Sequence, residues 1–222
     1  MSTLIYEESA VRGPHVRIGA SFARLLRLHL MSRRVPAAVI ALLLCAPLLQ
    51  WSISGALGQG DFSGARDSAE QLSLLVETAA AAVVGAALHG PFGESERTAG
   101  RRLPWLRLAT ALLLTAVALG AVYVGVLGTR LPVGEFAALR DTAGMIGISV
   151  LCTVIIGGQF GWVGPVAYWV VGAYAFTDHW QTPWTWPARP GADGGAALCA
   201  FGFLAASLLA ITVIGPRQHS RD

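Results

Sequence analysis

The sequence contains no lysine, and all 16 of its basic residues are arginine. A Walker A phosphate loop and a Schiff-base enzyme both need a lysine side chain. The chain therefore cannot carry out either chemistry by itself. If it performs energy-driven work, ATP hydrolysis must come from a partner protein.

Charge of either sign is scarce. Charged residues make up 13% of the chain and hydrophobic residues 54%, whereas a soluble domain usually carries about 25% charged residues. So few charges cannot cover a water-exposed surface, and those present cluster between long apolar stretches. We expect an all-α integral membrane protein.

Motifs for metal or nucleophilic chemistry are also missing. The three cysteines lie inside apolar runs without metal-ligand spacing, which favours small buried side chains over a disulfide or a zinc site. The histidines do not form the deep pair that haem ligation needs, and HExxH, CxxC and GxSxG do not occur. We therefore expect no catalytic residue, no cofactor, no metal and no nucleic-acid partner.

The first 34 residues differ from the rest. Residues 1–14 are short and mixed, and we expect a disordered cytoplasmic tail. Residues 15–34 alternate leucines with arginines in a helical pattern, which predicts an amphipathic helix lying in the cytoplasmic interface. An early start of the first membrane helix is the alternative. The segment is too long and too arginine-rich for a cleavable signal peptide.

The remaining hydrophobic runs predict a six-helix transmembrane domain over residues 35–216, followed by a cytoplasmic tail at 217–222. Residues 142–177 contain no charge, and one helix of that length would be about 54 Å long against a hydrocarbon core of about 30 Å. Because Gly157 to Pro165 is rich in glycine, we divide this run there into two spans. The predicted spans are residues 35–57, 71–90, 108–128, 142–159, 162–177 and 194–214.

Orientation follows from the arginines, because cytoplasmic segments carry an excess of them. Six spans with a cytoplasmic N-terminus put twelve arginines inside and four outside. We expect a multi-pass protein of the bacterial cytoplasmic membrane with both termini in the cytoplasm.

The most polar internal segment, Glu94 to Arg107, joins the second and third spans on the cytoplasmic side. Its acidic residues come first and its arginines later, an order that suits the dipole of a short helix. A charged helix at the membrane face could bind a soluble partner, whereas the alternative is a simple positive-inside anchor loop. The residues that would make this contact are Glu94, Glu96, Arg97, Arg101 and Arg102.

This layout resembles the permease subunit of type-2 ABC exporters. The local match is Glu96-Arg97-Thr98-Ala99-Gly100, continuing to Leu103-Pro104. The likeness in layout covers about residues 15–214, although the chain is shorter than many family members and lacks a large external domain.

The resemblance implies that the loop between spans two and three is a coupling helix that docks on a separate ABC ATPase subunit. It further implies that two permease subunits associate as a homo- or heterodimer, and that the external segment before the last span re-enters the membrane. We expect export of a hydrophobic or amphipathic substrate. A non-transporting accessory, assembly or immunity protein is the alternative.

Two other features stand out. Glu77 is the one carboxylate well inside an apolar run. It is a candidate translocation-path or proton-linked residue, with Arg140 as one possible partner; a structural hydrogen bond between helices, or a position nearer the outer interface, is the alternative. Trp180, Trp184 and Trp186 before the last span predict an interfacial belt or, alternatively, a re-entrant gate over the pathway.

Overall fold

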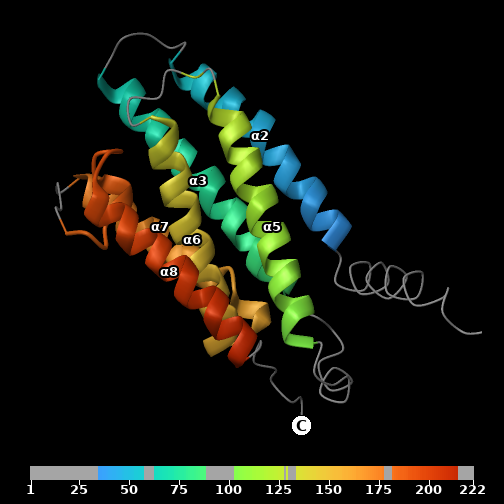
Figure 1. Cartoon of the computed structure of the whole chain (residues 1–222). Coiled ribbons are helices and arrows are strands. Elements are labelled where there is room, and N and C mark those ends of the chain that lie inside the picture. Colours follow the sequence, from blue (N-terminus) through green and yellow to red (C-terminus); the bar gives the residue numbers. More distant parts are fainter. Residues whose placement is uncertain are drawn as a thin grey trace, which may run out of the picture.

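A computed structural model describes residues 35–57, 63–88, 103–127, 129, 134–177 and 182–214 (Figure 1). These residues form α-helices and two short 3-10 helices, with no strand among them, which confirms the all-α prediction. The α-helices are α2 (Val35–Leu57), α3 (Ser63–Leu88), α5 (Leu103–Val126), α6 (Glu135–Ile155), α7 (Val163–Thr177) and α8 (Gly194–Val213); the 3-10 helices are η2 (Gly158–Phe160) and η3 (Trp186–Ala188).

Five of these helices are long and apolar enough to cross a membrane, so the chain is a multi-pass membrane protein. The candidate spans are Val35–Gly55, Ala69–Leu88, Trp105–Val126, Glu135–Ile155 and Gly194–Val213. The remaining helix, α7, has 15 residues. At 1.5 Å per residue it is about 22 Å long, less than the hydrocarbon thickness of about 30 Å, and a sixth crossing stays a prediction.

Helix α6 lies at the centre of the bundle. Buried residues make up 72% of an apolar 18-residue stretch of this helix, against 28% in α2 and 22% in α8. The outward faces of α2 and α8 are apolar, with Trp51, Leu198 and Val213 among their most exposed side chains. Such faces suit hydrocarbon or another apolar protein surface, whereas the inner helices pack against one another.

Small residues let the inner helices approach closely. A Cβ atom added at Gly147 of α6 would lie 2.7 Å from the backbone nitrogen of Leu204 in α8. One added at Gly125 of α5 would lie 2.9 Å from the carbonyl oxygen of Ala46 in α2. These glycines are therefore needed for backbone contact between helices, as is common in membrane bundles.

The start of α6 corrects one prediction. The span expected to begin at Thr142 begins at Glu135, so residues 135–141 are helical and not part of a loop. Because the uncharged run begins at Thr142, the sequence predicts that Arg140 and Asp141 belong to the loop before this span. In the structure both are buried and paired with each other, which makes their position inside the bundle possible.

The expected break in the long uncharged run does occur between two helices. Helix α6 ends at Ile155 and α7 begins at Val163. Gly157 between them has φ +129°, a conformation that residues with a side chain rarely adopt.

Candidate functional site

The predicted site residues fall into two groups. The coupling-loop residues Glu94, Glu96, Arg97, Arg101 and Arg102, like Trp180 and the helix predicted at 15–34, lie outside the described residues. Glu77, Trp184 and Trp186 are described. The last two belong to the segment between α7 and α8, of which residues 182–193 are described.

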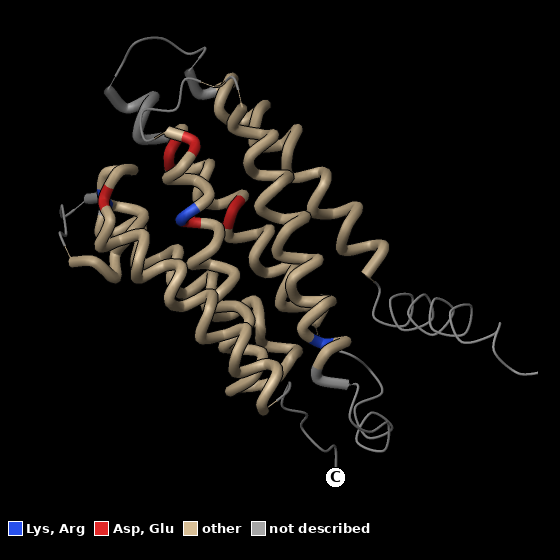
Figure 2. The backbone as a smooth tube through the Cα atoms, viewed as in Figure 1, with Lys and Arg blue, Asp and Glu red and all other residues tan. Residues whose placement is uncertain are grey.

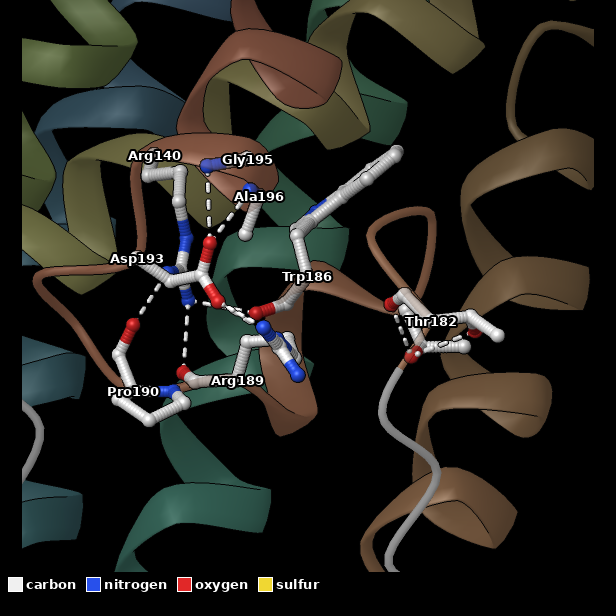
Figure 3. Close-up of polar contacts among 9 residues, drawn as sticks. Arg140, Thr182, Trp186, Arg189, Pro190, Asp193, Gly195 and Ala196 are labelled. Carbon is white, nitrogen blue, oxygen red and sulfur yellow. Dashed lines mark hydrogen bonds and ion pairs between the residues drawn. The ribbon is translucent and has the colours of Figure 1, made fainter.

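The side chain of Arg140 binds the backbone carbonyls of this segment (Figure 3). Its Nη1 donates to the Pro190 carbonyl at 2.9 Å, and its Nη2 donates to the carbonyls of Trp186 at 2.6 Å and Arg189 at 3.2 Å. Its Nε donates to the Asp141 carboxylate at 2.8 Å. The side chain of Arg140 is fully buried. We call this arrangement of Arg140, Asp141 and the three carbonyls the arginine clamp.

Trp186 fixes the same segment to the bundle through apolar contacts. Its indole is completely buried, stacked on Tyr168 of α7 with 4.6 Å between ring centroids and set against Phe203 of α8 at 5.7 Å. It occupies the space left by Gly144 of α6, where an added Cβ atom would lie 2.5 Å from the indole. The segment therefore folds into the bundle at this point.

The interfacial-belt interpretation is consequently wrong for Trp186, because a ring without exposed surface cannot face lipid headgroups. Trp184, two residues earlier, is 45% exposed, and its carbonyl accepts a hydrogen bond from the Tyr168 hydroxyl at 2.6 Å. The difference arises from tertiary packing, since both tryptophans belong to the same proline-rich stretch.

Beyond Trp186, the segment leads into α8 through a well-formed cap. Asp193 Oδ1 accepts from the amides of Gly195 at 2.8 Å and Ala196 at 3.1 Å, and its Oδ2 accepts from Arg189 Nε at 2.7 Å (Figure 3). The hydrogen bond from the Ala196 amide, followed by that from Arg189, lowers the pKa of Asp193 below its ordinary value of 3.8. Arg140 and Arg189 therefore both stabilise this segment through hydrogen bonds.

Glu77 lies in α3 with 2% of its surface exposed. Ser73 Oγ lies 2.8 Å from Glu77 Oε1 and donates to it, while Glu77 Oε2 is buried without a hydrogen-bond partner. Across the α3–α6 contact, Glu77 interacts electrostatically with Asp141 and Arg140. The buried carboxylate and the clamp therefore form one electrostatic unit.

This unit stands out because charge is rare along the described helices. Figure 2 shows most of the tube without charge and the charged positions gathered mainly in the half of the bundle that holds the α2–α3 and α5–α6 connections. Within the described residues, no group of three or more histidine, cysteine or acidic side chains could hold a metal ion.

Sequence reasoning identified Glu77 and named Arg140 as one possible partner, but it missed Asp141. The structure gives Arg140 its hydrogen bonds to Asp141 and the segment carbonyls, with Glu77 within electrostatic range. The adjacent arginine and aspartate immediately before a long uncharged run were the available signal. An oppositely charged pair can enter a membrane helix where a lone charge would not.

Comparison with known proteins identifies no relative: no family model, no curated protein and no solved structure matches the chain.

Proposed function

We propose that the chain is the permease subunit of an ATP-driven exporter of the type-2 ABC class. The observation that carries the proposal is the fold of the segment before α8. Its Trp186 is fully buried in the bundle and its carbonyls bind Arg140 of the central helix. The resemblance to these permeases implies an external segment at this place that re-enters the membrane.

The ends of the helices agree with this assignment. In Figure 1 the end of α3 and the start of α5 lie at the same end of the bundle as the start of α2 and the end of α8. The arginine distribution predicts that this end faces the cytoplasm. An ATPase bound to residues 94–102 would therefore act on α3 and α5 directly.

The exposed apolar faces of α2 and α8 suit a second permease subunit. Leu198, Leu209 and Val213 of α8 are all more than half exposed. A path between two such faces would be lined by apolar side chains, which fits a hydrophobic or amphipathic substrate. In this mechanism, ATP-driven closure of the ATPase moves the coupling loop and opens the path between the two subunits.

The first test is purification of the tagged chain from its native membrane in mild detergent, with identification of the co-eluting proteins. We expect an ABC ATPase. Recovery of that ATPase falls at least tenfold after the charge reversals Glu96→Arg and Arg97→Glu.

The matched control is Glu135→Arg, an exposed charge at the other end of the bundle, which we expect to leave recovery unchanged. Purification without any ATPase, or equal recovery from all variants, refutes the proposal. That result favours the accessory, assembly or immunity protein instead.

A further inference from the structure

The charges buried around the arginine clamp do not balance. Arg140 contributes one positive charge. Asp141, whose carboxylate accepts a hydrogen bond from Arg140 Nε, contributes the matching negative charge. Glu77 is the third ionisable group of the unit and would add a second negative charge. An excess charge inside a membrane bundle is unfavourable, and a group without a counter-charge is neutralised instead.

The hydrogen bonds lead to the same conclusion. The guanidinium nitrogens of Arg140 are engaged by Asp141 and by three backbone carbonyls. Glu77 receives one hydrogen bond, from Ser73, and its second oxygen has no partner although the residue is 98% buried. A carboxylate anion in such a place normally collects several donors. A single donor is enough for a neutral carboxylic acid.

Among the side chains that the structure describes, the helices packed around Glu77 supply no counter-charge besides Arg140. Glu70 on α3 adds negative charge near Asp141, and Tyr168 of α7 interacts electrostatically with the clamp. The described part of α2 contains no charged residue, and the only charged residue of α5, Arg107, lies near the beginning of that helix. Glu135 is exposed at the start of α6.

We propose that Glu77 is a proton-binding site inside the bundle, with the Arg140–Asp141 pair as its fixed neighbouring charges. The protonated acid leaves Arg140 bound to the segment before α8. Loss of the proton creates an anion across the α3–α6 contact, which competes with the segment carbonyls for Arg140 and loosens the clamp. This inference does not rest on the permease assignment and is tested on the isolated chain.

The test is infrared spectroscopy of the purified protein in lipid, without any ATPase. We expect the carbonyl stretching band of a protonated carboxylic acid at pH 7, shifted on transfer to heavy water. Glu77→Gln removes the band, and the control Glu135→Gln leaves it unchanged. Because glutamine mimics the protonated acid in shape and charge, Glu77→Gln retains the melting temperature of the unmodified chain.

A second variant tests the role of the neighbouring charges. Asp141→Asn removes the anion next to Arg140, so Glu77 becomes the only counter-charge and ionises; the band disappears at pH 7. The proposal is overturned if the unmodified chain has no such band, if the band survives Glu77→Gln, or if Glu77→Gln no longer folds. It is equally overturned if Asp141→Asn keeps the band at full intensity.

Discussion

Replacement of Arg140 by methionine tests how far the bundle depends on the arginine clamp. Methionine keeps much of the side-chain length but removes every donor. The change leaves Asp141 as a buried anion without its partner, and removal of one member of a buried ion pair costs about 3–5 kcal/mol. The buried Trp186 carbonyl loses its donor as well, which adds about 1–3 kcal/mol.

Taken together, the free energy of unfolding falls by about 4–8 kcal/mol, above the range of about 0.5–3 kcal/mol for most single substitutions. The carbonyls of Arg189 and Pro190 contribute less, because their hydrogen bonds are only partly buried. The measurement is unfolding in mixed micelles with increasing denaturing detergent, followed by tryptophan fluorescence, which reports directly on Trp186.

A double-mutant cycle distinguishes a charge effect from lost packing. Adding Asp141→Asn to Arg140→Met removes the unpaired anion, so the double variant is more stable than Arg140→Met by about 2 kcal/mol or more. The matched control is Arg189→Met, which affects a more exposed arginine of the same segment and has a much smaller effect. If the double variant is less stable than Arg140→Met, or if Arg189→Met is equally damaging, the reasoning from buried charge is refuted.

Three further predictions follow from single features of the chain. Gly144→Ala forces Trp186 to move and costs about 1–3 kcal/mol, whereas Gly120→Ala, with no atom within 4 Å of the new Cβ, is neutral or stabilising in the same unfolding assay. The pKa of Asp193 is lowered in the folded state, so its stabilising effect is complete above the ordinary value of 3.8 and is lost as the pH falls further. The difference in melting temperature between the unmodified chain and Asp193→Ala therefore shrinks below that pH. A difference that stays constant contradicts the prediction. A single cysteine that replaces Arg101 reacts with a membrane-impermeant maleimide only after the membrane is opened. Labelling in intact cells would place this residue outside the cell and contradict the predicted topology.

The amino-acid sequence by itself determined the class of this protein and most of its helices. Long apolar stretches form helices in a membrane because hydrocarbon offers no partner to the backbone, so length and hydropathy are enough to locate them. Residues 35–57, predicted as one span, are helical throughout, and the glycine-rich stretch around Gly157 does separate two helices. The protein class and the location of these helices depend only on residues that are close to one another in the sequence.

Only the tertiary structure decided where the charges and aromatic rings go. Hydropathy assigned Arg140 to a loop, yet its partners include carbonyls 46 to 50 residues away in sequence, and those partners allow it to lie within α6. Likewise, composition gave Trp184 and Trp186 the same role, while the space beside Gly144 buries only the second. The free energy of a buried charge or ring depends on the groups that surround it, and folding brings those groups together from distant parts of the chain.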